Sequence, residues 1–179
     1  MEEENSDFLL VPHERIGSVI GKNGSTKREI ELRTNTKLIV DSKEGEIECR
    51  QKGDSLGHFN AMRIVKAIAR GFSPEKAFRL LEEGTIIEII DLKEIIGKSK
   101  GTITAKKGRV IGSKGKAREE IETDTGANIS VYGKTISIIG KEEEIEKAKK
   151  AVDMLLGGAS HQAVYGSLRR KIKNERFEL

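Results

Sequence analysis

The sequence predicts an α+β fold made of two small domains that share the element order βααββα, and three observations lead to this prediction. First, one short segment occurs twice, as VIGKNG at 19–24 and as VIGSKG at 110–115. Second, the offset of 91 positions between the copies also pairs Gly17 with Gly108 without a gap. Third, apolar residues around both copies follow the same succession of strand and helix periods. A chain of 179 residues accommodates two domains of about 70 residues each.

In the first unit, the apolar run that Pro12 closes predicts a strand. Gly21 ends a short helix, and Ser25 or Thr26 begins the next one. Apolar residues at helical spacing indicate a last helix, which Gly71 is placed to end. In chain order, the expected elements are a strand at 8–11, helices at 15–20 and 25–33, strands at 37–40 and 46–50, and a helix at 61–72.

The second unit repeats this order with one irregularity. The expected elements are a strand at 85–91, helices at 100–111 and 116–123, strands at 127–132 and 135–139, and a helix at 142–156. The first strand lies much further from its Gly-x-x-Gly segment than in the first unit. Either about eleven residues are inserted around 93–103, or this strand is misplaced.

A helical connector and a basic tail complete the chain. Ser73 as N-cap and Pro74 at the first helical position predict a short helix between the units. In the tail, Val164, Leu168 and Ile172 recur every four residues among basic side chains. This helix either packs its apolar stripe on the other domain or adds RNA contacts as well, and both readings stay open. The predicted domains are 1–72, a connector at 73–84, 85–158, and the basic helical tail at 159–179.

Charge is concentrated around the repeated segments although the net charge is only +4. Nine Lys or Arg and a single acid, Glu94, lie between 93 and 118, and four Lys or Arg lie between 15 and 28. Acids collect elsewhere, above all at 142–146. A cluster of this kind indicates phosphate binding, with the second unit as the stronger site.

A Gly-x-x-Gly turn before a helix is suited to a phosphodiester backbone. Glycine has no Cβ to hold a sugar-phosphate strand at a distance, and the helix start offers free N–H groups and a positive dipole end. Apolar residues, Leu38 among them, are expected to line a groove for unstacked bases. The candidate RNA-binding residues are Ile20, Gly21, Lys22, Asn23, Gly24, Lys27 and Arg28 in the first unit, and Arg109, Ile111, Gly112, Ser113, Lys114, Gly115, Lys116, Arg118 and Ile129 in the second.

Other kinds of site find no support in the sequence. The segment GSVIGKN at 17–23 is one residue short of a Walker loop and has no hydroxyl after its lysine. The three histidines and the aspartates show no metal-ligand or catalytic spacing, and Cys49 reads as a half-buried strand residue. We therefore expect no catalytic residue, metal or cofactor. Without a long apolar run or a basic leader, the chain is expected to be a soluble cytoplasmic protein and a monomer.

The combination of Val-Ile before each Gly-x-x-Gly, the βααββα order and the second copy resembles the KH domain, an RNA-binding module. The resemblance covers about 7–71 and 85–157 and implies that each loop clamps about four nucleotides of single-stranded RNA. One departure recurs. Where many KH domains carry an apolar residue three positions after the second glycine, this chain has Lys27 and Arg118.

Two further segments narrow the resemblance, GFSPEKAFRLL at 71–81 and VYGSLR at 164–169. With them, the chain is similar to the archaeal partner-of-Nob-one family of assembly factors for the small ribosomal subunit. That resemblance implies binding to small-subunit rRNA near its 3′ end, beside the rRNA-maturing endonuclease or another ribosomal or translation factor, without catalysis. Two alternatives stay open: an RNA-binding adaptor in RNA degradation or translation, and a protein-interaction scaffold with KH folds.

Overall fold

The computed structural model describes residues 6–175, with side chains described up to Arg170. It divides the chain into two compact units, 1–83 and 84–179, which are treated one at a time. The acidic start of the chain lies outside the described residues, as do the side chains of Lys171, Ile172, Lys173 and Arg176 from the predicted tail.

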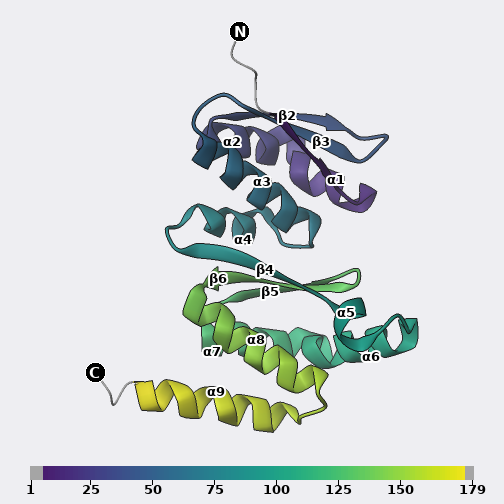
Figure 1. Cartoon of the computed structure of the whole chain (residues 1–179), viewed down its shortest axis with the longest axis vertical. Helices are drawn as coiled ribbons and strands as arrows, with labels where there is room; N and C mark the ends of the chain where they lie inside the picture. The colour runs from purple at the N-terminus through teal and green to yellow at the C-terminus, as the bar shows by residue number, and fades with distance from the viewer. Residues whose placement is uncertain (1–5, 176–179) are drawn as a thin grey trace. The chain divides into compact units, whose positions relative to one another are not determined.

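The first unit has a three-stranded antiparallel sheet with its helices on one face (Figure 1). The strand order is β1-β3-β2, so β2 is an edge strand beside the helix that follows the first loop. In the register, Leu9 of β1 and Val40 of β2 both lie opposite Ile47 of β3. The elements are β1 (Ser6–Leu10), α1 (His13–Ile20), α2 (Ser25–Thr34), β2 (Thr36–Asp41), β3 (Glu46–Gln51) and α3 (Ser55–Ala69).

Helix α3 is the element whose bounds differ most from the prediction. It begins at Ser55 because the Asp54 carboxylate caps it, accepting a hydrogen bond from the Gly57 N–H at 2.7 Å. The first turn also carries His58, which is buried and donates from Nε2 to the Asp7 carboxylate of β1 at 2.7 Å. These polar residues interrupt the apolar pattern from which the start of the helix was predicted.

The connector helix packs within the first unit. The Ser73 hydroxyl caps α4 (Pro74–Phe78), and a 3₁₀ turn (Arg79–Leu81) follows. Ala77 and Leu80 are buried where this segment contacts α3, and the Arg33 guanidinium of α2 lies 4.8 Å from the centre of the Phe78 ring. The predicted N-cap and N1 proline are therefore confirmed.

The second unit repeats the architecture, with strand order β4-β6-β5 and helices on one face of the sheet (Figure 1). Its elements are β4 (Thr85–Asp91), α5 (Leu92–Ile96), α6 (Lys100–Ile111), α7 (Lys116–Thr125), β5 (Asn128–Tyr132), β6 (Thr135–Lys141), α8 (Glu142–Leu156) and α9 (His161–Glu175). The predicted α+β fold of two units with the order βααββα is confirmed, and α5 and α9 are additions in the second unit. No helix among residues 6–175 is both long and apolar enough to cross a membrane.

The sheet register decides between the two readings of the irregular spacing. Strand β4 pairs with β6 along its whole length, from Thr85 opposite Lys141 to Asp91 opposite Thr135, so the strand was placed correctly. Positions 9 and 88, which face equivalent residues of the central strands, are 79 apart, whereas the loops are 91 apart. Twelve residues are therefore inserted. They form α5 and lengthen α6 at its start.

Helix α9 packs on its own unit. Val164 and Leu168 belong to the core of the second unit, together with residues of α7 and α8. On the α7 side, the Arg169 guanidinium lies 3.2 Å from the Glu120 carboxylate and 3.3 Å from that of Asp124. The prediction that the stripe packs on the other domain is wrong, because the apolar faces of α7 and α8 need this cover.

Cys49 lies on the core face of β3 and is fully buried, with its Sγ 3.7 Å from Nδ1 of His58. Burial raises the pKa of its thiol to about 11, and the nearby Asp7 carboxylate adds to the rise against a hydrogen bond from Thr36. The thiol is therefore neutral and inert at physiological pH.

This pKa predicts a loss of stability in alkali. In the unfolded chain the thiol ionises near its ordinary value, whereas in the folded chain it ionises only near pH 11. The unfolded state therefore loses the proton first, and stability falls as the pH rises from about 9 to 11. Urea unfolding should show a steeper decline over this range for the wild type than for Cys49→Ala. Parallel declines would contradict the assignment.

Candidate nucleic-acid interface

Both Gly-x-x-Gly loops have the same backbone conformation. The first glycines, Gly21 and Gly112, have φ of 74° and 73° and end α1 and α6. The second variable residues, Asn23 and Lys114, are left-handed with φ of 52° and 51°. Asparagine tolerates this region well, whereas lysine enters it at a cost of about 1 kcal/mol, so the second loop stores a little strain.

The first glycine of each loop is required by packing. A Cβ added to Gly21 would lie 2.3 Å from Thr26 Oγ1, and one added to Gly112 would lie 2.5 Å from Ala117 Cβ. Neither neighbour has room to retreat, because both are buried at the start of the following helix. The loop therefore packs tightly against the helix that it introduces.

The second glycine of each loop is required for a reason other than packing. Gly24 and Gly115 are left-handed, with φ of 76° and 82°, but a Cβ there would meet only the ends of flexible side chains, at 3.2 Å or more. These ends are the Arg28 guanidinium at Gly24, and the Arg118 guanidinium and the Glu119 carboxylate, both at 3.7 Å, at Gly115. Gly24 is half-buried and Gly115 is buried, so this glycine is required by its left-handed backbone rather than by a clash.

The helix starts behind the loops have no side-chain cap. Neither α2 nor α7 receives a capping hydrogen bond from its N-cap, which is a glycine in both units. By contrast, Asp54 caps α3 and Ser73 caps α4. Uncapped N–H groups at a helix start, combined with the helix dipole, favour an anion at this position.

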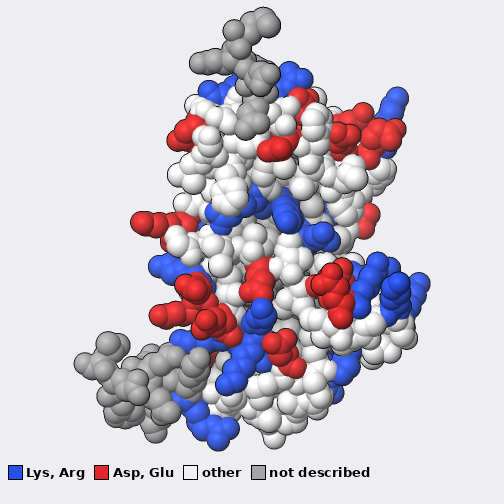
Figure 2. Space-filling view, in the orientation of Figure 1, with Lys and Arg blue, Asp and Glu red and all other residues white. Residues whose placement is uncertain are grey.

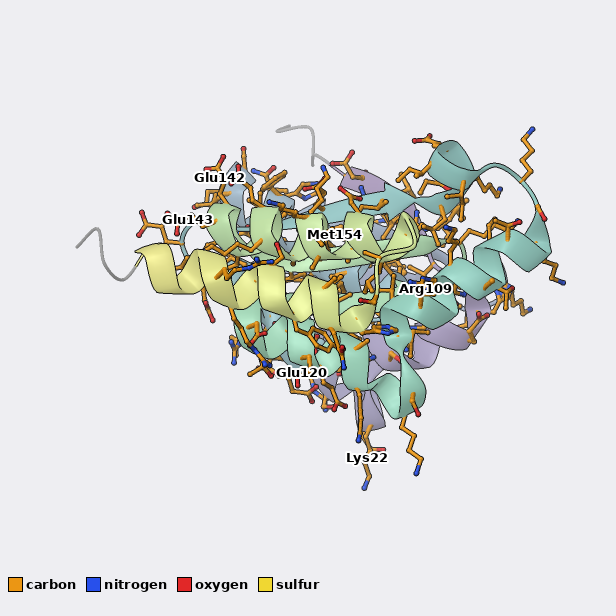
Figure 3. The ribbon with its side chains drawn as sticks, turned by 90° about the horizontal axis from the view of Figure 1, so that it is seen from below. Lys22, Arg109, Glu120, Glu142, Glu143 and Met154 are labelled. Atoms are coloured by element: carbon orange, nitrogen blue, oxygen red, sulfur yellow. The ribbon has the colours of Figure 1, made fainter. Side chains whose placement is uncertain are left out.

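Positive side chains surround both loops. Lys22, Lys114 and Lys116 are exposed, and Lys22 projects away from its unit (Figure 3). The variable residues Asn23 and Ser113 are exposed as well. A buried donor without a hydrogen-bond partner in the described part of the chain normally points to a missing ligand or water, and Nε of Arg118 is such a donor. Its counterpart Lys27 instead lies 3.9 Å from the Glu31 carboxylate.

Several cations of the second unit serve packing instead. Arg109 donates to the carbonyls of Leu155 at 2.9 Å and Ala159 at 2.6 Å, and Lys106 donates to that of Leu156. These bonds hold α6 on the end of α8, where a cation also matches the helix dipole. Arg15 of the first unit plays the same part, donating to the carbonyls of Ile68 and Phe72 at the end of α3.

The structure therefore reduces the charge difference between the loops that the sequence suggests. Lys107, like Lys106 and Arg109, donates to a backbone carbonyl, that of Gly133 at 2.7 Å. In addition, Glu119 lies in the first turn of α7, whereas the first turn of α2 contains no acid. An RNA contact of Arg109 stays a prediction, since its guanidinium has a structural role here.

The apolar candidates separate into two groups. Ile20 and Ile111, the last residues of α1 and α6, are half-buried directly before the loops. Leu38 and Ile129 are core residues, 0% and 2% exposed. The apolar wall that this structure offers to a base is therefore narrower than predicted, because the side chain of Ile129 points into the core.

Two carboxylates were missed by the sequence analysis. Glu31 of α2 accepts a hydrogen bond from the Leu38 N–H at 2.9 Å, and Glu122 of α7 accepts one from the Ile129 N–H at 2.7 Å. These bonds fasten each loop-bearing helix to an edge strand. The signal was available, since the repeat register pairs Glu31 with Glu122 and Leu38 with Ile129. Within residues 6–175 there is no group of ligating side chains that could hold a metal ion.

Comparison with known proteins agrees with this geometry. Residues 86–173 match the model of the eukaryotic type KH domain (KH-domain type I), and residues 6–63 match the general KH-domain model. A KH domain-containing protein of Methanocaldococcus jannaschii is 43% identical over 99% of this chain and 80% of its own length.

The chain is also similar to a solved archaeal structure and to a eukaryotic protein. The crystal structure of an a/eIF2alpha–aDim2p–rRNA complex from Pyrococcus horikoshii contains a chain that is 45% identical, with a TM-score of 0.89 over 97% of both chains. The pre-rRNA-processing protein PNO1 of Saccharomyces cerevisiae is 29% identical over 79% of this chain. This chain spans only 47% of that yeast protein.

The two glycines of the second loop should respond differently to substitution. Gly112→Ala combines left-handed strain with overpacking against Ala117 and should lower the free energy of unfolding by more than about 2 kcal/mol. The Cβ of Gly115→Ala would only contact the side chains of Arg118 and Glu119, both at 3.7 Å, so left-handed strain alone should cost about 1 kcal/mol. Denaturant unfolding of the two variants measures this difference, and equal losses would show that the packing of the first glycine does not matter.

Proposed function

The chain belongs to the family of tandem KH-domain proteins that includes archaeal Dim2p and the pre-rRNA-processing protein PNO1, and from this premise we propose that it binds single-stranded small-subunit rRNA during ribosome assembly. The RNA segment that we propose lies near the 3′ end of that rRNA. The binding takes place in the cytoplasm, without a metal or cofactor.

One observation carries the proposal: each unit has a helix start that lacks a side-chain cap and is preceded by a turn with two glycines. The positive end of the helix dipole at each start attracts an anion, and a phosphate also supplies several acceptor oxygens to the surrounding donors at once. The same arrangement in both units supports a grip on one strand at two places. Each place then takes about four nucleotides.

In the bound state, each part of the loop has its own task. The phosphate lies against Gly115, where no Cβ keeps it away from the first turn of α7. Arg118 is next to this point, and the phosphate gives its buried Nε the partner that it lacks. Lys114 and Lys116 draw the strand in, and the half-buried Ile111 meets the following base.

This chemistry is binding and not catalysis. The one thiol, Cys49, is buried and neutral. We propose that cleavage of the bound rRNA belongs to a separate endonuclease, which this protein positions. The solved complex of the Pyrococcus relative, which includes a/eIF2alpha, supports a translation factor as a further partner.

Charge reversal in the loops tests which unit grips harder. We expect Ser113→Asp with Lys114→Asp to weaken RNA binding more than Lys22→Asp with Asn23→Asp, because only the second loop has beside it a buried donor without a partner, Nε of Arg118. Aspartate tolerates the left-handed position, so folding is kept. The slope of log affinity against log salt should fall by about 0.7 for each phosphate lost. A larger loss from the first pair would reverse the ranking of the units.

Crosslinking in cells tests the identity of the RNA. With the wild-type protein, the recovered fragments should come mainly from the 3′ region of small-subunit rRNA. With the Ser113→Asp and Lys114→Asp protein, this enrichment should drop, which controls for non-specific contacts. Recovery mainly of mRNA would instead identify an adaptor in translation or RNA degradation and would refute the assembly role.

A further inference from the structure

A cavity of about 250 Å³ lies between α8 and α9 of the second unit, away from the loop. Met154 and Leu168 form its apolar floor, and Lys147, Lys150 and Arg170 form a positive rim. The Ser167 hydroxyl adds a polar group that can donate a hydrogen bond. Figure 3 shows α9 between the α8 side, marked by Met154, and the α7 side, marked by Glu120.

The charged side chains around the cavity determine where an anion is attracted. Glu142, Glu143 and Glu144 make the first turn of α8 acidic. Basic side chains gather along the border of α8 and α9 (Figure 2). On the other side of α9, Arg169 is paired with Glu120 and Asp124. An anion is therefore repelled from the start of α8 and attracted to the cavity rim.

The start of α9 is tied to the helix that carries the second loop. His161 donates from Nε2 to the Arg109 carbonyl at 2.8 Å, one turn before Gly112. Between His161 and the cavity residues 167–170, α9 advances about 10 Å, since each residue adds about 1.5 Å. An RNA strand that leaves the second loop therefore has only a short distance to cover along α9 before it reaches the cavity.

We propose that this cavity binds a phosphate of the same RNA, outside the nucleotides held by the Gly-x-x-Gly loop. The proposal rests on the RNA-binding function proposed above. The rim supplies charge and hydrogen bonds to one phosphate group, and the floor of Met154 and Leu168 contacts the attached sugar or base. The open face of α9 thereby extends the RNA-binding surface of the second unit.

The size of the cavity favours this occupant. Pockets for small-molecule ligands usually hold about 300 to 1,000 Å³, so a free metabolite would be poorly enclosed here. A nucleotide within a strand needs less enclosure, because the rest of the strand is already bound and the second contact is intramolecular. A site of low intrinsic affinity is therefore sufficient when the loop already holds the strand.

The test compares two RNA lengths on the full chain. The variant carries Lys150→Gln and Arg170→Gln, and both of these side chains are exposed at the rim. An RNA of about four nucleotides fills only the loop of the second unit, whereas one of about twenty is long enough to reach the cavity as well. We expect the variant to bind the longer RNA on the order of tenfold more weakly, with a salt slope smaller by about 0.7, and to bind the shorter RNA like the wild type.

A matched variant removes the same charge elsewhere. Lys43→Gln with Lys66→Gln also loses two positive charges, from exposed positions of the first unit. It should bind both RNAs like the wild type apart from a small, length-independent loss. If the cavity variant behaved like this control, the cavity would not be an RNA site. An equal loss for both RNAs would also overturn the proposal, because the effect would then not depend on reaching the cavity.

A second measurement locates the RNA directly. Because Cys49 is buried, a Ser167→Cys thiol can be labelled selectively with an iron chelate that cleaves nearby RNA. We expect cleavage at one place, beyond the segment that the loops protect. No cleavage above that from a label at Lys43→Cys would refute the proposal. If charge reversal in both loops left all binding intact, the proposed function itself would fail, and the two failures are therefore distinguishable.

Discussion

The structure of each unit depends on one close approach, that of the first loop glycine to the helix that follows. At Gly112 the approach leaves no room for a Cβ beside Ala117, and at Gly21 it leaves none beside Thr26. This contact sets the angle at which α6 gives way to α7, and α1 to α2. The helix start follows the loop without a side-chain cap, and the edge strand is held beside it through Glu122 or Glu31.

Basic side chains in this chain either bind backbone carbonyls or extend into solvent beside the loops, and the structure shows which residues do which. Arg15 and Arg109 bind carbonyls at the ends of α3 and α8, so they hold the loop-bearing half of each unit against its last helix. Lys22 and Lys114 reach into solvent beside the loops. A count of basic residues along the sequence therefore overstates the number of cations available at the second loop, since Lys106, Lys107 and Arg109 donate to backbone carbonyls.

The sequence predicts most of the fold because local signals and the repeat agree. The bounds predicted for β4, α6 and α8 match the structure, since glycines or acidic residues mark their ends. The start of α3 was predicted too late, although Asp54 is a visible N-cap, because the first turn is polar. The partners of Arg109 and the burial of Ile129 depend on contacts far apart in the chain, which no local pattern encodes.

The geometry of the loop also limits how this protein can diverge. Both glycines are fixed, one by packing and one by conformation, so variation is confined to the pair between them. Of that pair, the first position holds exposed side chains as different as Lys22 and Ser113, whereas the second has a left-handed backbone, which Asn23 tolerates and Lys114 adopts at a cost. Selection for a different RNA can thus change the charge of the grip with a single substitution while the scaffold stays unchanged.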